Sequence, residues 1–422
     1  MTIILFLFLS FFVGVPIGFS LGLVSTIQMS QMGMSLSIVC QRLFAGIDST
    51  TLVAVLLFTL AGSLMMKGGM SERLIDFADT LVGHLPSGMA MVAVLACMFF
   101  AALTGAAVAA AAAIGGIMIP IMLDKGYDKG FTASLLATSA SIGPIIPPSI
   151  PMLIYGVLAS VSVAKLFIGG IFPGILMGLS LMVVSILVGK KRKYVGRPKR
   201  ATKGEILHAA KRAILALLTP IIILGGIMGG VFTATEAATV AVIYSIIVGA
   251  FIYRVLTLKD FLESLVDAAK TTGMVLMVVG FANLFTWVIS MMLLPQQLTA
   301  FLSSILHSKY TFLLVVNIVL LIAGTFIDTT SAILIFTPLF LPLAKTFGVD
   351  PLHLGVVMAV NLSIGMCTPP LGVCLFVTGG ITKIPIKEML KDLWPQLLAL
   401  IIVLFIITYI PTTVTFLPNL FS

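Results

Sequence analysis

Long apolar runs recur along almost the whole sequence, and they set the class of fold. An α-helix needs about 20 residues to cross the ~30 Å hydrocarbon core of a bilayer. Only 9% of the residues are charged, against about 25% in soluble domains. A β-barrel would need alternating segments of about ten residues, and none occur. The sequence therefore predicts an all-α polytopic membrane protein. The apolar runs cover 3–27, 50–66, 88–123, 131–189, 213–256, 273–294, 311–344 and 393–411.

The basic residues predict how the chain is oriented in the membrane. Their densest cluster lies at 190–203, and an excess of Lys and Arg marks cytoplasmic loops. Counting outward from this loop predicts nine crossings and two re-entrant hairpins, with the N-terminus cytoplasmic and the C-terminus periplasmic. The scheme leaves four of the 24 Lys and Arg residues outside: Arg42, Lys165, Lys309 and Lys345. The net charge of +9 thus reflects topology, and no nucleic-acid partner is expected.

Each crossing and surface helix has a predicted range. The run 3–27 lacks a preceding basic residue and an A-x-A site, so we expect a first span rather than a cleaved signal peptide. Glu236 follows Thr233 and is interpreted as a helix cap. The other crossings are predicted at 50–67, 130–158, 166–189, 213–232, 235–256, 272–293, 353–380 and 393–411, the hairpins at 88–123 and 311–344, amphipathic helices on the inner interface at 71–84 and 257–270, and a similar arm on the outer side at 28–48.

The sequence also matches itself at an offset of 222 residues. From 120 to 176 the match is ungapped and gives 13 identities in 57 positions, among them Gly143 with Gly365 and the pair Pro147–Pro148 with Pro369–Pro370. By the charge count the first copy begins inside and the second begins outside. The repeats are therefore predicted to be inverted. Inverted repeats with broken helices indicate a secondary transporter. The alternative is a duplicated scaffold without a transport role.

Prolines interrupt the same helix in each copy, within SIGPIIPPSIPM (141–152) and SIGMCTPPLGVC (363–374). A helical N–H donates to the carbonyl four residues earlier, and proline has no N–H. We therefore expect open carbonyls, which together with neighbouring hydroxyls suit a hard cation such as Na⁺. The alternative is a kink satisfied by Ser or Thr side chains. The expected open carbonyls are Gly143, Pro144, Gly365 and Met366, and the nearby polar side chains are Ser139, Ser141, Ser149, Asn361, Ser363 and Thr368.

The hairpin tips are predicted to form the opposing wall of the site. The first turns near TGAAVA (104–109) and the second near GTFIDTTS (324–331). Asp328 is the only acid deep in its run, and a charge there costs at least ~2.5 kcal/mol. We interpret it as a cation ligand with Thr329, Thr330 and Ser331; the alternative is an N-cap, and both roles are compatible. The aligned residue in the first tip is Ala106. Helix N-termini at the tips favour an anionic substrate.

Several long motifs carry a family resemblance. The runs PPSIPMLIYG (147–156), GGVFTATEAATVAV (229–242), GTFIDTTSAILIFTPLFLPLA (324–344), GVDPLHLGVVMAVN (348–361) and TPPLGVCLF (368–376) resemble the large membrane subunit of tripartite ATP-independent periplasmic (TRAP) transporters. The resemblance implies a sodium-coupled importer of the ion-transporter superfamily that moves a small organic acid by an elevator motion. It also implies two partners, which are a small four-helix membrane subunit on a separate chain and a periplasmic substrate-binding protein.

The resemblance also implies where ligands bind. Sodium sites are expected where a hairpin tip meets a helix break, with the substrate between them and no other cofactor. Many relatives carry serines at the first tip, whereas this chain has alanines there. The expected sodium ligands are Gly105, Ala106, Ser141, Gly143 and Pro144 in the first copy and Asp328, Thr329, Ser363, Gly365 and Thr368 in the second, and the expected substrate contacts are Thr104, Gly105, Pro147, Pro148, Ser149, Thr330, Pro369 and Pro370.

The expected division is into a scaffold and a moving transport part. A stand-alone sodium/anion symporter of the same superfamily is the alternative function. An enzyme is not expected, because an intramembrane aspartyl protease needs two membrane aspartates and there is no HExxH or GxSG motif. The scaffold is predicted at 1–87, 166–212 (with the basic loop), 233–309 and 386–422, the transport part at 88–165 and 310–385, and a linker span at 213–232.

Overall fold

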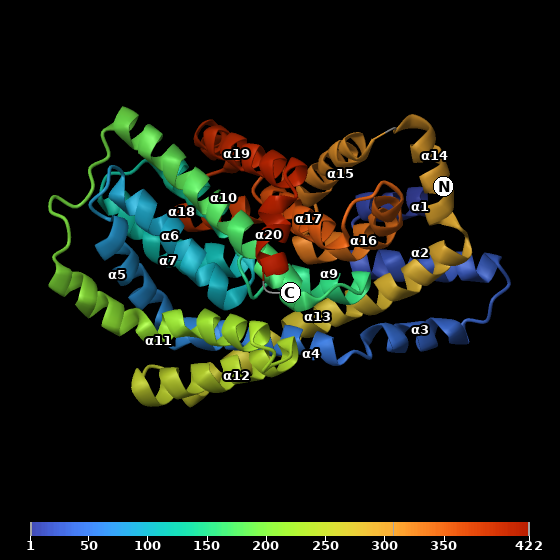
Figure 1. The fold of residues 1–422 in the computed structure, drawn as a ribbon, viewed down its shortest axis with the longest axis horizontal. Helices are drawn as coiled ribbons and strands as arrows, with labels where there is room; N and C mark the ends of the chain where they lie inside the picture. Colours follow the sequence, from blue (N-terminus) through green and yellow to red (C-terminus); the bar gives the residue numbers. More distant parts are fainter. Residues whose placement is uncertain (1, 307, 421–422) are drawn as a thin grey trace.

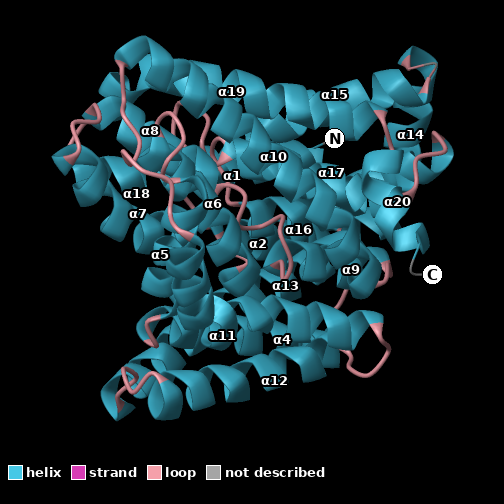
Figure 2. Cartoon of the chain, turned by 60° about the vertical axis from the view of Figure 1, so that its left-hand side comes forward, coloured by secondary structure: helices cyan, strands magenta, loops and turns pink. Residues whose placement is uncertain are grey.

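The computed structural model describes residues 2–306 and 308–420, and within them the chain is helical without a strand (Figure 2). Eight helices in this part of the chain are long and apolar enough to cross a membrane. This confirms the predicted all-α membrane class. The eight are α4 (Thr50–Lys67), α7 (Ala107–Asp124), α10 (Val163–Arg192), α11 (Lys203–Met228), α12 with the π-helix η1 (Ala234–Ile252), α13 (Leu258–Met291), α16 (Thr329–Thr346) and α19 (Ile386–Tyr409).

Shorter helices complete the two halves, and the helices of the hairpins and broken helices have boundaries that follow the 222-residue register closely. The clearest case is α7, whose ends at Ala107 and Asp124 map onto the ends of α16 at Thr329 and Thr346. That the halves are inverted across the membrane stays a prediction. The shorter helices are α1 (Thr2–Phe12), α2 (Ile17–Gln31), α3 (Ser37–Ile47), α5 (Met70–Val82), α6 (Gly88–Thr104), α8 (Lys129–Ala140), α9 (Ile150–Ala159), α14 (Leu294–Ile305), α15 (Lys309–Gly324), α17 (Pro351–Gly365), α18 (Val373–Thr382) and α20 (Thr412–Leu420).

The predicted hairpins and broken helices correspond to helix pairs, while re-entrance of the hairpins into the membrane stays a prediction. Hairpin 88–123 is α6 and α7, joined at Gly105, and hairpin 311–344 is α15 and α16. Broken helix 130–158 is α8 and α9, and 353–380 is α17 and α18. Both breaks contain a cis peptide bond between their two prolines.

The first apolar run is not the single span that we predicted. It forms two helices, α1 and α2, which pack against each other. Gly14 takes a left-handed conformation with φ of 85°, and Pro16, which has no N–H, precedes α2. Both features end a helix, so neither part is long enough to cross the membrane alone.

The predicted surface helix at 257–270 is also wrong as a separate element. It is the first part of α13, which runs without interruption for 34 residues. A capping box between Thr257 and Asp260 begins the helix, and no proline follows within it. The other stretch predicted as an amphipathic surface helix, 71–84, is a separate helix, α5, because Gly69 turns the chain with φ of 74°.

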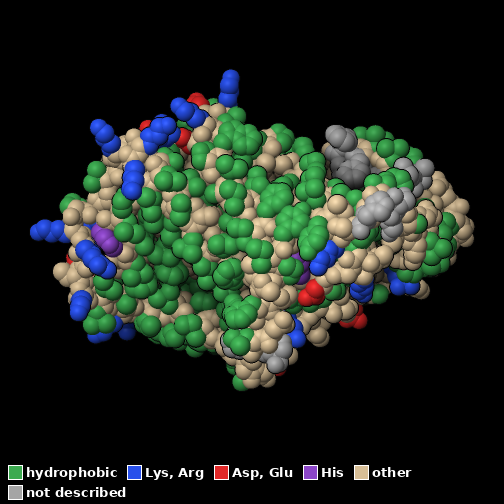
Figure 3. Space-filling model, turned by 45° about the horizontal axis from the view of Figure 1, so that its top comes forward, with side chains coloured by type: hydrophobic (Ala, Val, Ile, Leu, Met, Phe, Trp, Pro, Cys, Tyr) green, Lys and Arg blue, Asp and Glu red, His purple; other side chains and the backbone are tan. Residues whose placement is uncertain are grey.

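The helices pack as two groups. One contains α2, α3, α4, α11, α12 and α13, of which α4, α11 and α12 lie side by side along the lower edge of Figures 1 and 2. The other contains the two hairpins, the two broken helices, α10 and α19. Apolar side chains cover most of the face seen in Figure 3, with Lys and Arg gathered toward one end. On α10, Leu179, Val183 and Leu187 are half exposed or more, as expected for side chains that face lipid.

Candidate functional site

The two hairpin tips meet at a cavity of about 540 Å³ between the two groups of helices. The tips and residues of both helix breaks form one wall, and α2, α4 and α13 form the other. The only charged side chain among the lining residues is Asp328. The tip wall includes Gly105, Ala106, Ala107, Pro144, Asp328, Thr329, Thr330, Ser331 and Met366, and the opposite wall includes Ile17, Val55, Thr59, Thr271, Met274 and Val278.

At the first tip the backbone of the hairpin lies directly against the first break. Gly105 turns the chain with φ of 62°, and Ala106 precedes α7 in an extended conformation. A Cβ added to Gly143 would lie 2.8–3.0 Å from backbone atoms of Ala106 and Ala107. A Cβ on Gly105 would meet the carbonyl oxygen of Pro148. Glycine is thus required at both positions, and it brings the predicted group Gly105, Ala106 and Gly143 together.

At the second tip the carboxylate of Asp328 caps α16. Its Oδ2 accepts a hydrogen bond of 3.1 Å from the Ser331 N–H, which confirms the capping interpretation. The side chain is half-buried and lines the cavity. Thr329 Oγ1 donates to the sulfur of Met366 at 3.1 Å, joining this tip to the second break. The cation role of Asp328 stays a prediction, compatible with this geometry because a carboxylate has further lone pairs.

Of the four carbonyls that we expected to be open, three accept other hydrogen bonds. Pro144 accepts from Ser149 Oγ, Gly365 from the Thr368 N–H at 2.8 Å, and Met366 from the Cys374 N–H at 3.0 Å. The expectation counted helical donors only, whereas the interrupted chain turns back and supplies others. Within the described residues the carbonyl of Gly143 accepts no hydrogen bond. Gly143 packs against Ala106 and Ala107 of the first tip, so its carbonyl is the strongest backbone candidate for a cation ligand.

Polar side chains near the breaks keep free acceptor capacity. Ser141 Oγ donates to the Thr138 carbonyl at 2.7 Å, and Thr368 Oγ1 donates to the Ile364 carbonyl at 2.8 Å, so each hydroxyl oxygen can still accept. Among the buried side-chain oxygens without a hydrogen-bond partner in the described part of the chain, three lie near the breaks: Ser139 Oγ, Ser363 Oγ and Asn361 Oδ1. An oxygen-rich set of this kind fits a hard cation such as Na⁺.

Only some of the residues predicted to contact the substrate line the cavity. Gly105 and Thr330 line it. The hydroxyl of Ser149 caps α9 through the Met152 N–H at 3.2 Å, and that of Thr104 donates to the Phe100 carbonyl at 3.2 Å. Neither residue lines the cavity, and neither do Pro147, Pro148, Pro369 and Pro370.

Sequence reasoning missed the opposite wall. Thr59, Thr271 and Met274 face the tips from α4 and α13. They sit in helices without a break at these positions and have no repeat partner of the same residue type, so no local pattern distinguishes them from ordinary membrane-facing residues.

The sequence of this chain matches a known protein family over nearly its whole length. A family model for the DctM component of tripartite ATP-independent periplasmic transporters matches residues 3–413. The chain belongs to this family. It is therefore a large permease of the TRAP type, a multi-pass inner-membrane transport protein rather than an enzyme. The family implies a periplasmic binding protein and a small membrane subunit as partners.

Individual TRAP permeases are similar over most of their length. The C4-dicarboxylate TRAP transporter large permease protein DctM of Pseudomonas aeruginosa is 43% identical over 90% of this chain and 88% of its own. The sialic acid large permease protein SiaM of Vibrio cholerae is 38% identical over 97% and 96%. The isethionate permease protein DctMQ of Oleidesulfovibrio alaskensis is 41% identical over 94% of this chain, which spans 63% of that longer protein. The solved YdaH transporter of Alcanivorax borkumensis shares the fold, with a TM-score of 0.63, 15% identity and coverage of 88% and 87%.

Proposed function

We propose that this permease imports a small organic acid, a carboxylate or sulfonate, together with Na⁺. The observation that carries the proposal is the cavity at which both hairpin tips, the first break and one carboxylate meet. The relatives named above are permeases for C4-dicarboxylate, isethionate and sialic acid, which are all anions. A periplasmic binding protein delivers the substrate to the permease, and a small four-helix membrane subunit completes the transporter.

Charge explains why import of an anion here requires cations. The lining contains a carboxylate and no Lys or Arg, so an anion meets no formal positive charge from the protein. The N-termini of α7 and α16 supply partial positive charge at the tips. Sodium ions bound at Gly143 and at Asp328 supply the rest, and this couples the two ligands thermodynamically.

Buried polar contacts indicate which helices move together in an elevator cycle. Gln396 of α19 donates to Ser134 at 3.0 Å and accepts from Thr138 at 2.7 Å, both on α8. Arg192 of α10 pairs with Asp128 at 2.7 Å and also with Asp392. The Arg192 pairs are partly exposed, but breaking the buried Gln396 contacts in each cycle would leave polar groups unsatisfied. We therefore assign α10 and α19 to the moving transport part. This differs from the sequence-based prediction, which assigned 166–212 and 386–422 to the scaffold.

The test is uptake into liposomes that contain the purified permease. We expect accumulation of C4-dicarboxylate, isethionate or sialic acid only with an inward Na⁺ gradient, the small subunit and a loaded binding protein. Replacing Na⁺ by K⁺ should abolish it. Sodium-driven uptake by the permease alone would instead establish the stand-alone symporter, and uptake that ignores the Na⁺ gradient would overturn sodium coupling.

A further inference from the structure

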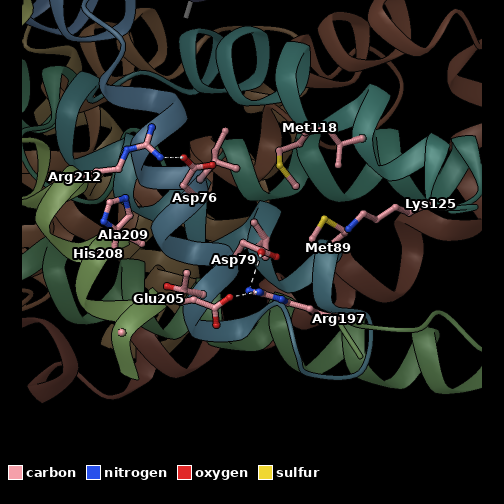
Figure 4. A pocket seen from close by; sticks show the side chains of 15 residues that line it. Asp76, Asp79, Met89, Met118, Lys125, Arg197, Glu205, His208, Ala209 and Arg212 are labelled. Carbon is pink, nitrogen blue, oxygen red and sulfur yellow. Dashed lines mark hydrogen bonds and ion pairs between the residues drawn. The ribbon is translucent and has the colours of Figure 1, made fainter. Parts of the chain in front are cut away.

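A second cavity, of about 570 Å³, lies at the other end of the first hairpin from its tip (Figure 4). One wall is formed by α5 and the start of α11, the other by the start of α6, the end of α7 and Lys125. Its floor is apolar, with buried Ile75, Met89 and Met118. By the charge count this end of the molecule faces the cytoplasm, and α5 is the amphipathic helix predicted on the inner interface.

The charges around this cavity are unequally paired. On the wall of α5 and α11, Arg212 pairs with Asp76 at 3.3 Å. Arg197 pairs with Glu205 at 2.7 Å and more distantly with Asp79, at 3.9 Å (Figure 4). Two arginines thus face three carboxylates on this wall, which leaves one excess negative charge.

The opposite wall carries the excess positive charge. Lys125 directly follows α7, is exposed, and makes no ion pair with any residue of the described chain. The formal charges that line the cavity therefore sum to zero, but they are separated. The carboxylate without a close cation, that of Asp79, lies on one wall, and the unpaired ammonium of Lys125 lies on the other.

We propose that this cavity binds a zwitterionic aminophospholipid, whose headgroup joins a phosphate to a primary ammonium. The phosphate would contact Lys125 and the ammonium would contact Asp79, both as charge-assisted hydrogen bonds. A purely anionic lipid would leave the excess carboxylate unpaired. Soluble phosphoethanolamine shares the headgroup chemistry, but only the lipid uses the apolar floor at Met89 and Met118. The site is separate from the tip cavity and does not rest on the proposed function.

Native mass spectrometry of the purified full chain tests this with three lipids of equal chain length. We expect phosphatidylethanolamine adducts to exceed those of phosphatidylglycerol. Phosphatidylcholine, whose quaternary ammonium has no N–H donor, should also bind less. Lys125→Ala should weaken the phosphatidylethanolamine adduct about tenfold, the effect of one charged hydrogen bond, and Asp79→Asn should do the same.

Matched controls separate the site from general charge effects. Lys129→Ala and Asp124→Asn remove exposed charges at the two ends of the same α7–α8 connection that do not line the cavity, and they should keep the adduct. Lys125→Ala removes no ion pair, so its folding should not suffer even if Asp79→Asn loosens Arg197. Equal binding of phosphatidylglycerol, or an unchanged adduct in Lys125→Ala, overturns the proposal. Displacement of the lipid by an equal concentration of phosphoethanolamine overturns its lipid part.

Discussion

Asp328 and Ala106 occupy the same position in the two halves. Each is the extended residue before the second helix of its hairpin, and the two align in the 222-residue register. Only Asp328 adds a charge and a side-chain cap. Sequence reasoning identified this residue because an acid in an apolar run is costly. It could not show that, of the four carbonyls expected to be open, only that of Gly143 accepts no hydrogen bond in the described chain, because that depends on how the chain turns back after each break.

The double role of Asp328 can be separated by substitution. Asp328→Asn keeps an oxygen for the Ser331 N–H and removes the charge. We expect the apparent affinity for Na⁺ to fall about tenfold or more, because a charged ligand contributes ~1.5–3 kcal/mol. Sodium titration of uptake in liposomes measures this.

Asp350→Asn is the matched control, because Asp350 caps α17 through the Leu352 N–H at 2.9 Å and lies outside the tip cavity. Its sodium dependence should match the wild type. An unchanged sodium titration in Asp328→Asn would refute the cation role.

At the scale of elements, glycine–glycine contact joins a hairpin to a break. A Cβ on Gly365 would lie 2.5–2.9 Å from three backbone atoms of Gly324, so α15 and α17 approach at backbone distance. Proline and glycine patterns predicted both breaks and both hairpins. The same patterns failed at 3–27 and at 257–270, because a run of apolar residues does not reveal whether Gly14 adopts a positive φ or whether α13 continues through Gly273.

Gly365→Ala should therefore destabilise the permease. The added methyl group meets backbone atoms that cannot rotate away, and such overpacking typically costs ~1–3 kcal/mol. A thermal unfolding assay in detergent should show a clear decrease in Tm.

Gly380→Ala provides the comparison, because it lies in α18 with nothing within 4 Å of the added Cβ. Its Tm should stay level or increase, since alanine is favoured over glycine in helices by ~0.5–1 kcal/mol. Equal Tm changes in the two variants would argue against the close contact.

At the scale of the whole molecule, the native cysteines report orientation. Cys40 is exposed on α3, whereas Cys97, Cys367 and Cys374 are buried. The predicted topology puts α3 on the periplasmic side. A membrane-impermeant maleimide should therefore label intact spheroplasts at Cys40.

The Cys40→Ser variant should lose this labelling, which identifies the reacting thiol. Labelling of Cys40 only after the membrane is permeabilised would reverse the predicted orientation of α3 and of the helices that follow it.

The unequal tips also have an electrical consequence. In the proposed cycle the empty moving part carries the carboxylate of Asp328 without its cation back to the periplasmic side. The inside of the cell is negative, so outward displacement of a negative charge is favoured, by up to ~2.3 kcal/mol per 100 mV for a charge that crosses the whole field. The first tip has the uncharged Ala106 at the equivalent position, so it adds nothing to this electrical free energy. One acid at one tip would thus make the resting potential of the cell drive the return of the empty carrier.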